Sequence, residues 1–220
     1  MTTEDEARLL ALLSHELRAP AGVVSGYLKL LAREAGLTER QQTLVQQAMG
    51  ASEKLHGVLA DLRDLLRCHE GALPLERRAV PLEQLAAEVA AAAATGPEAP
   101  SPRVGTLPNV VLQVDRARLT AALSAIVRAA GRPLGAAAVV HLTGTLDETP
   151  AVRLLIAPDG AGQDDAPVAA LDESRGGQGL TLPLARAIIH AHAGTVTEQP
   201  QQAGAARFTV VLPQGPHGER

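Results

Sequence analysis

The sequence predicts an α+β protein in which an N-terminal αα-hairpin precedes an α/β sandwich. About the first 70 residues contain almost no helix breakers and carry apolar residues at helical spacing, whereas helical and strand-like segments alternate after Gly71. A chain of 220 residues is long enough for two small domains, each with its own core. We therefore expect a hairpin domain over residues 1–72 and an α/β domain over residues 77–214.

Two stripes of apolar residues predict the helices of the hairpin. Between them, Gly36 provides a helix stop and Thr38 an N-cap for the second helix. Two helices cannot bury two apolar stripes by themselves, so we expect two copies of the chain to pair as a dimeric four-helix bundle. The second stripe has alternating spacings of four and three residues, as in a heptad seam. The first stripe consists of Leu9, Leu13, Leu17, Val24, Leu28 and Leu31, and the second of Leu44, Ala48, Ser52, Leu55, Leu59, Leu62 and Leu66.

The remainder of the chain predicts one sheet covered by helices. A Pro/Gly-rich connector is expected over residues 95–108, and a long polar loop over residues 158–175. Asp115 is placed to cap one of the helices. The expected helices cover residues 82–94, 115–130 and 180–193, and the expected strands cover residues 137–143, 152–156 and 207–212.

Composition and charge exclude several classes of protein. One Tyr, one Phe and no Trp argue against a base-stacking surface, and a net charge of −4 argues against a phosphate-backbone binder, so no nucleic-acid partner is expected. The single cysteine, Cys68, cannot form an intrachain disulfide and suits a reducing compartment. No apolar run is long enough to span a bilayer, and the N-terminus is acidic. These features predict a cytoplasmic protein without membrane insertion, and a membrane sensor, if there is one, would be a separate chain.

The run from Leu13 to Pro20, Leu-Ser-His-Glu-Leu-Arg-Ala-Pro, resembles the H-box of sensor histidine kinases. In the second half, Asp115 to Leu119 resembles the start of the N-box helix and Phe208 to Pro213 the final strand of the family's ATPase domain. Gly160 and Gly162 correspond to the first Gly box of that domain, and Gly177 and Gly179 to the second. The resemblance covers nearly the whole chain and is most specific at the H-box.

The resemblance implies that His15 is a phospho-acceptor, because a neutral imidazole is nucleophilic and its phosphoramidate is labile. Glu16 would be the base that assists His15, although adjacent helical residues do not share a face and a solvated acid beside Arg18 is the alternative. Ala19 lies on the face of His15, where the family usually has a Thr or Asn that orients water, so weak or absent phosphatase activity is expected. Pro20 should kink the helix.

The nucleotide site of the ATPase-like domain is expected to be degenerate. The two positions where the resemblance implies a metal-holding Asn are Ala125 and Ala129. Pro158 stands where an Asp should bind the adenine amino group, Asp159 comes one residue late, and Thr181 replaces the third glycine of the second Gly box. Each loss would remove a contact worth roughly 1.5–3 kcal/mol.

No resident cofactor is therefore expected, and binding of ATP with Mg²⁺ is doubtful. The remnant glycines also serve as turn and packing residues. The histidines outside the H-box, His190 and His192 included, indicate no metal site.

Three functions are compatible with this sequence. The first is a phosphotransferase, similar to those derived from histidine kinases, in which His15 accepts a phosphoryl group from a response-regulator receiver Asp and passes it on without ATP. The second is a non-catalytic pseudokinase that binds a kinase or a response regulator as a scaffold. The third is an ATP-dependent histidine kinase with an atypical nucleotide site. A homodimer, a receiver domain and a separate sensor kinase are the expected partners.

Overall fold

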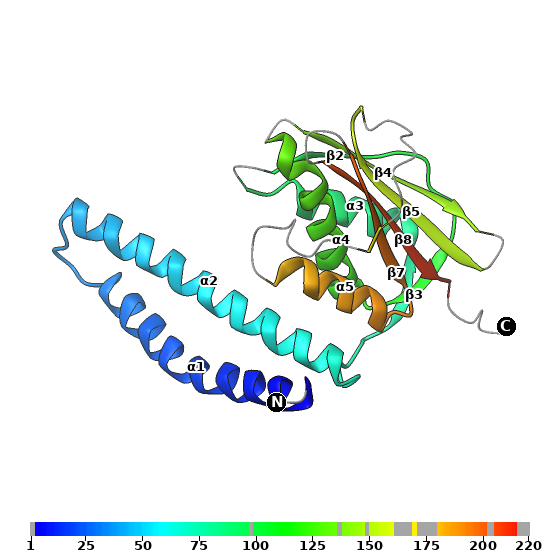
Figure 1. Cartoon of the computed structure of the whole chain (residues 1–220). Helices are drawn as coiled ribbons and strands as arrows, with labels where there is room; N and C mark the ends of the chain where they lie inside the picture. Colours follow the sequence, from blue (N-terminus) through cyan, green and yellow to red (C-terminus); the bar gives the residue numbers. More distant parts are fainter. Residues whose placement is uncertain are drawn as a thin grey trace. The chain divides into compact units, whose positions relative to one another are not determined.

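The computed structural model describes residues 3–96, 99–135, 138–147, 150–160, 169–170, 180–201 and 205–214. The chain divides into two compact units, Met1–Glu70 and Gly71–Arg220, which we call the hairpin and the C-terminal domain. Figure 1 shows the first as two long helices and the second as helices packed on a sheet. This is the predicted α+β architecture.

The hairpin consists of α1 (Thr3–Leu31) and α2 (Glu39–His69). The turn between them follows the predicted signals, because Gly36 has φ +94° and Thr38 is the N-cap of α2. Thr38 and Gln41 form a capping box in which the Gln41 backbone N–H donates to Thr38 Oγ1 at 3.4 Å and the Thr38 N–H donates to Gln41 Oε1 at 2.9 Å. Helix α1 continues through Pro20 and follows a bent course, whereas α2 is nearly straight (Figure 1).

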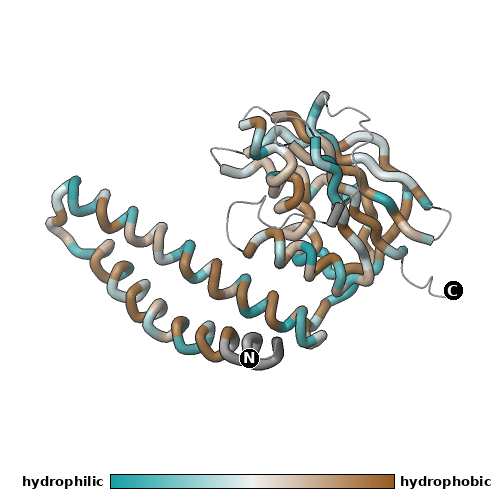
Figure 2. The backbone as a smooth tube through the Cα atoms, viewed as in Figure 1, coloured by the Kyte–Doolittle hydropathy of each residue, from teal (hydrophilic) through white to brown (hydrophobic). Residues whose placement is uncertain are grey.

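Few side chains are buried between the two helices of the hairpin. The described ones are Ser14 and Ala21 on α1, and Ser52, Leu59 and Leu66 on α2, so each helix repeats its buried position after seven residues. Figure 2 shows hydrophobic positions recurring along both helices. Many of them face solvent in a single chain, and the large ones are Leu10, Leu12, Leu13, Leu17, Val23, Val24, Tyr27, Leu30, Leu31, Leu44, Leu55 and Val58.

The C-terminal domain contains two sheets and three α-helices in its described residues. A six-stranded sheet has the order β2-β4-β5-β8-β7-β6, and β1 and β3 form a separate antiparallel pair. The helices are α3 (Leu82–Ala93), α4 (Arg116–Gly131) and α5 (Thr181–Ala191), with a short 3₁₀ turn, η1 (Arg132–Leu134), after α4. The strands are β1 (Arg78–Pro81), β2 (Ser101–Val104), β3 (Val111–Val114), β4 (Val139–Leu146), β5 (Ala151–Pro158), β6 (Ala169–Ala170), β7 (Thr195–Pro200) and β8 (Ala206–Pro213).

The core of this domain lies between the helices and one face of the six-stranded sheet (Figure 1). Strand β8 alternates buried and half-buried residues, and its buried row includes Phe208, Val210 and Leu212. Leu123 and Ile126 of α4 and other aliphatic side chains complete the layer. One aromatic ring therefore anchors a core that is otherwise aliphatic.

Several predicted elements need correction. The expected connector over residues 95–108 contains β2, which pairs in parallel with β4, and Pro102 is tolerated there because β2 is an edge strand. Strands β1, β3, β6 and β7 were not predicted, β6 lies within the loop expected over residues 158–175, and the expected single sheet is two sheets. Strand β4 begins at Val139 rather than at residue 137 and ends at Leu146. The missed strands are two to six residues long, too short for a clear alternation.

The predicted helices of the C-terminal domain are all present, including the one capped by Asp115. None of the helices in the described part of the chain has the length and hydropathy of a membrane span.

Candidate functional site

His15 lies on α1 with its side chain 81% exposed. The neighbouring Ser14 is only 3% exposed and belongs to the seam with α2, so the helix turns His15 away from that seam. Leu13 and Leu17, which belong to the apolar stripe expected to face a second copy, are about half exposed in the single chain, at 47% and 51%. In the single chain the imidazole is therefore open to solvent.

Glu16 lies closer to His15 than helix geometry alone suggested. Its Oε1 atom is 3.7 Å from His15 Nδ1, and both side chains are 81% exposed. This separation exceeds a hydrogen bond, but it places a negative charge beside Nδ1. A proton held on Nδ1 leaves Nε2 with the free lone pair. Ala19, one turn after His15, is exposed and carries no hydrogen-bonding group.

The two N-box alanines lie on α4. Ala125 is 5% exposed and Ala129 is 3% exposed, so both methyl groups are packed in the core of the C-terminal domain. A methyl group offers no ligand atom to a metal ion. No cluster of three or more His, Cys, Asp or Glu within the described ranges is arranged to hold a metal.

The first Gly box follows the last residue of β5, the buried Pro158. The side chain of Asp159 is 73% exposed, its Oδ1 accepts a hydrogen bond from the Gly160 N–H at 3.1 Å, and it lies 3.6 Å from His141 Nε2. Gly160 has φ +73°, which explains its presence as a turn residue. Gly162, Gly177 and Gly179 lie outside the described residues, while Thr181 begins α5.

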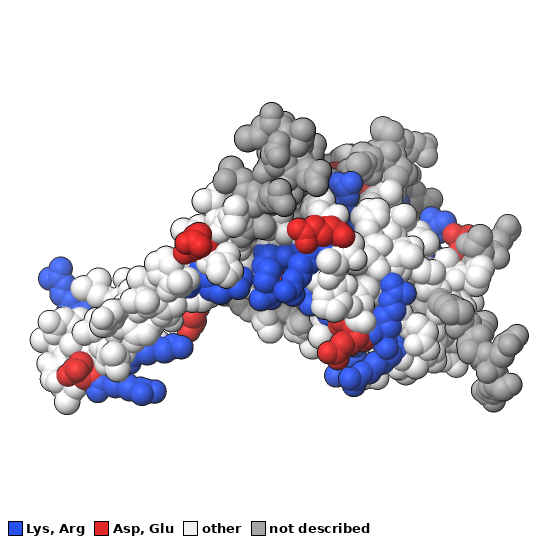
Figure 3. Space-filling view, turned by 90° about the horizontal axis from the view of Figure 1, so that it is seen from below, with Lys and Arg blue, Asp and Glu red and all other residues white. Residues whose placement is uncertain are grey.

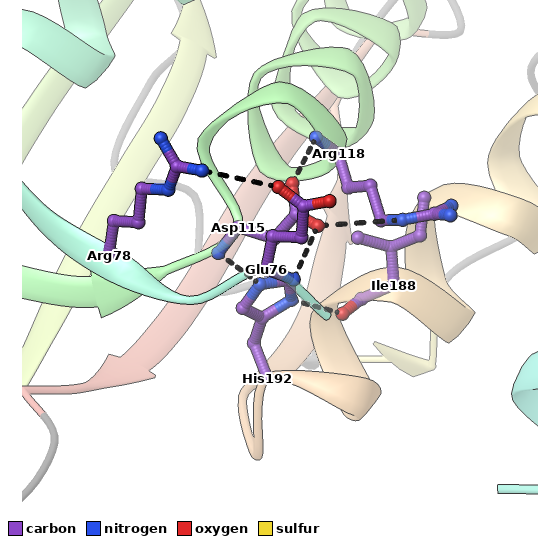
Figure 4. Close-up of polar contacts among 6 residues, drawn as sticks. All are labelled: Glu76, Arg78, Asp115, Arg118, Ile188 and His192. Carbon is purple, nitrogen blue, oxygen red and sulfur yellow. Dashed lines mark hydrogen bonds and ion pairs between the residues drawn. The ribbon is translucent and has the colours of Figure 1, made fainter. Parts of the chain in front are cut away.

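A buried polar network, drawn in Figure 4, joins three segments of the C-terminal domain. The sequence alone did not predict it. His192, the C-cap of α5, is 3% exposed, and its Nε2 accepts a hydrogen bond from the Asp115 N–H at 3.0 Å. Asp115 Oδ1 accepts from the Arg118 N–H, and Oδ2 accepts from the Glu76 N–H, each at 3.1 Å. His192 is thus a structural acceptor. The capping role of Asp115 was predictable, but nothing in the spacing of the chain indicated its partner 77 residues later.

The environment of His192 disfavours its charged form. Burial lowers the pKa of His192, a hydrogen bond with the Ile188 carbonyl and the Asp115 carboxylate oppose this, and the guanidinium groups of Arg77 and Arg118 lower it further. Figure 3 shows Lys and Arg side chains beside Asp and Glu on the face in view.

Comparison with known proteins places this geometry in context. Residues 5–71 match the His Kinase A (phospho-acceptor) domain. The sensor protein DivL of Caulobacter vibrioides is 27% identical over 92% of this chain and 27% of its own length. The probable sensor histidine kinase TcrY of Mycobacterium tuberculosis is 30% identical over 91% of this chain and 44% of its own length. The chain thus spans less than half the length of these curated relatives.

Solved structures share the fold of both units. Full-length ShkA in complex with AMPPNP superposes with a TM-score of 0.72 at 24% identity, covering 94% of this chain and 45% of that one. The histidine kinase ThkA in complex with the response regulator protein TrrA gives a TM-score of 0.56 at 16% identity, covering 96% of this chain and 63% of that one.

Proposed function

We propose that this chain, a sensor histidine kinase core, relays a phosphoryl group through His15 to or from a receiver Asp and does not take it from ATP. Residues 1–72 would form the dimerisation and phosphotransfer hairpin, and residues 77–214 the degenerate ATPase-like domain. The observation that carries this proposal is a contrast within one chain. The acceptor imidazole is exposed, whereas the two positions that should hold the nucleotide's metal ion are buried alanines.

The transfer step requires only an accessible, neutral imidazole. The unprotonated ring nitrogen attacks the phosphorus of a receiver aspartyl phosphate, so that a P–N bond forms as the P–O bond to the carboxylate breaks. The receiver carboxylate leaves as the anion, and the reverse reaction regenerates the acyl phosphate on a second receiver. Glu16 Oε1, 3.7 Å from Nδ1, would favour a proton on that nitrogen and direct Nε2 at the phosphorus. Ala19 would leave hydrolysis of the receiver phosphate without a water-positioning group.

The residues described at the nucleotide site do not fit Mg²⁺-ATP. Ala125 and Ala129 supply no amide oxygen, and Pro158 supplies no carboxylate. Asp159 does not replace it well, because its carboxylate bonds to the turn at Gly160 and lies beside His141. Each lost contact, worth roughly 1.5–3 kcal/mol, corresponds to about a tenfold or larger drop in the affinity for the nucleotide. The remnant glycines Gly160, Gly162, Gly177 and Gly179 would then serve the backbone only.

The proposed partners follow from the hairpin. Its exposed apolar face fits a second copy of the chain, giving a four-helix bundle with one His15 on each side. A receiver domain is the proposed transfer partner, and ThkA, which shares the fold, was solved with a response regulator. A separate sensor kinase would phosphorylate the first receiver, and the whole relay would operate in the cytoplasm.

Two incubations of the full chain test the proposal. In the first, radiolabelled ATP and Mg²⁺ are supplied. In the second, a receiver domain encoded beside this gene is supplied after phosphorylation by radiolabelled acetyl phosphate. We expect label on the chain only in the second incubation. The label should be lost in His15→Gln and kept in the control His69→Gln, which replaces an exposed histidine of α2.

The two alternatives predict different outcomes. Strong labelling from ATP that disappears in His15→Gln would replace our proposal with an ATP-dependent kinase, for which the intact H-box and the nearby Glu16 are the favouring observations. Absence of labelling from every neighbouring receiver would favour the non-catalytic scaffold.

A further inference from the structure

The segment that enters the C-terminal domain is tied down by its backbone. Glu76 lies just before β1, and its N–H donates to Asp115 Oδ2 at 3.1 Å. The next residue, Arg77, donates from its guanidinium to the Ala191 carbonyl at the end of α5, at 2.8 Å. Asp115 and the end of α5 therefore hold residues 76 and 77, and both meet at His192 (Figure 4).

The hydrogen bonds of His192 determine its protonation state. The Asp115 N–H can only donate, so His192 Nε2 must accept and must carry no proton. His192 Nδ1 lies 2.8 Å from the Ile188 carbonyl, which can only accept, so Nδ1 carries the proton. Both nitrogens are occupied by partners whose roles cannot be exchanged. The network is complete only with a neutral imidazole in this single tautomer.

Local backbone geometry prevents His192 from moving aside. The next residue, Ala193, has φ +58°, and its N–H donates to the His190 carbonyl at 2.8 Å. Gly194 follows with its N–H bonded to the Ile189 carbonyl, and a Cβ there would come within 2.6 Å of the Val211 carbonyl oxygen. The end of α5 is thus fixed against β8. A change in the charge of His192 must be accommodated by the groups that face it.

We propose that His192 is an acid-sensitive clasp, in which protonation of Nε2 releases Asp115 from the Glu76 N–H and frees the segment that enters the C-terminal domain. A proton on Nε2 would point at the Asp115 N–H, a donor facing a donor. The imidazolium then needs an acceptor, and the carboxylate whose charge acts on the ring is that of Asp115. Turning that carboxylate toward the ring withdraws it from the Glu76 N–H and from the first turn of α4.

The charged groups around His192 come from two other segments. Helix α4 and its cap contribute Asp115 and Arg118, and the entering segment contributes Arg77. The carboxylate supports protonation, whereas burial and the two guanidinium groups resist it, so the clasp is closed at neutral pH. Because the fold holds His192 neutral, this residue contributes fully to the stability of the C-terminal domain above about pH 6.5. The contribution is lost as the pH falls below that value. This inference does not depend on the proposed phosphoryl transfer.

Nuclear magnetic resonance on the full-length chain tests the clasp directly. The ring nitrogen shifts of His192 report its tautomer, and hydrogen exchange reports the protection of the Asp115 and Glu76 amides after correction for intrinsic rates. We expect Nδ1–H with a bare Nε2 above pH 7. On acidification, we expect both protection factors to fall about tenfold or more at the midpoint of the ring titration, because a donor loses its acceptor.

Variants separate the clasp from general acid loosening. His190→Gln, at an exposed position of the same helix, should keep the wild-type pH response. His192→Gln, if it folds, should lose that response at both amides. The proposal is overturned if the neutral ring carries its proton on Nε2, if the ring titrates while both amides stay protected, or if the wild-type response persists in His192→Gln. The first two outcomes need only the wild-type chain, so they stand even if the variant fails to fold.

Discussion

The hairpin and the C-terminal domain solve the problem of burying apolar surface in opposite ways. Of the large hydrophobic side chains that the structure describes as exposed, twelve belong to the hairpin and four to the C-terminal domain, which is about twice as long. Among the residues whose burial is described, the buried hydrophobic ones show the reverse, because three lie in the hairpin and the others in the C-terminal domain. The C-terminal domain closes its own core, whereas the hairpin leaves an apolar face available.

This difference indicates which unit depends on a partner. Two isolated helices with a thin seam are marginal in water, because helix propensity alone does not stabilise them. A sheet covered by three helices is not limited in this way. We therefore expect changes on the hairpin to act through association of two chains, and changes in the C-terminal domain to act within one chain.

The largest expected effect comes from charging the exposed face of α1. Leu17 and Val24, seven residues apart, are 51% and 54% exposed in the single chain. In a dimer that buries both residues, the double variant Leu17→Glu with Val24→Glu loses about 1.5–3 kcal/mol of association free energy for each buried side chain. Each position occurs once in each of the two chains, so the loss applies four times and four like charges enter the interface. Sedimentation equilibrium should then report the mass of one chain instead of two.

A matched control for this variant is Lys29→Glu. Lys29 is exposed and lies two heptads after His15, on the face that the proposal leaves open to a receiver. The Lys29→Glu variant should therefore remain dimeric. A wild-type chain that sediments as a monomer would contradict the dimer directly.

The next effect belongs to the C-terminal domain. Phe208, the only phenylalanine, is fully buried on β8, so Phe208→Ala should lower the free energy of unfolding of this domain by about 3–5 kcal/mol. Hydrogen exchange read by mass spectrometry should show faster exchange in β5 and β8 and unchanged exchange in α2. Thr209→Ala, on the other face of the same strand, should have little effect. Equal losses in the two variants would argue against a core that is anchored on Phe208.

The same contrast governs how much could be predicted from sequence. Helices such as α2 and α4 were predictable because their periodic stripes are long and their caps, Thr38 and Asp115, are local signals. Strand β2 was not, because four residues with a proline carry no alternation and the strand exists only through pairing with β4. Local chemistry identifies an element, whereas an edge strand depends on a neighbour far along the chain.

The candidate site divides along the same line. The H-box predicted His15 from eight consecutive residues, and the structure places its side chain in solvent. The clasp at His192 could not be predicted, because no local sequence motif marks the partners of its hydrogen bonds. Asp115 and Glu76, for example, are 39 residues apart. The spacing rule that adjacent helical residues do not share a face also understated how close Glu16 comes to His15.

The smallest expected effect concerns the turn of the hairpin. Thr38→Ala removes the side-chain acceptor for the Gln41 N–H and one half of the capping box, so it should destabilise the first turn of α2 by about 1 kcal/mol. Thr43→Ala is the matched control. The Thr43 hydroxyl only donates back to the Glu39 carbonyl at 2.9 Å, a bond that competes with the helix rather than capping it.

Amide exchange over residues 39–45 should therefore accelerate in Thr38→Ala and not in Thr43→Ala, with exchange in the C-terminal domain unchanged in both. Equal acceleration in the two variants would mean that this end of the hairpin is held by association between chains rather than by its cap. In that case the dependence of the hairpin on a second copy would extend to its turn.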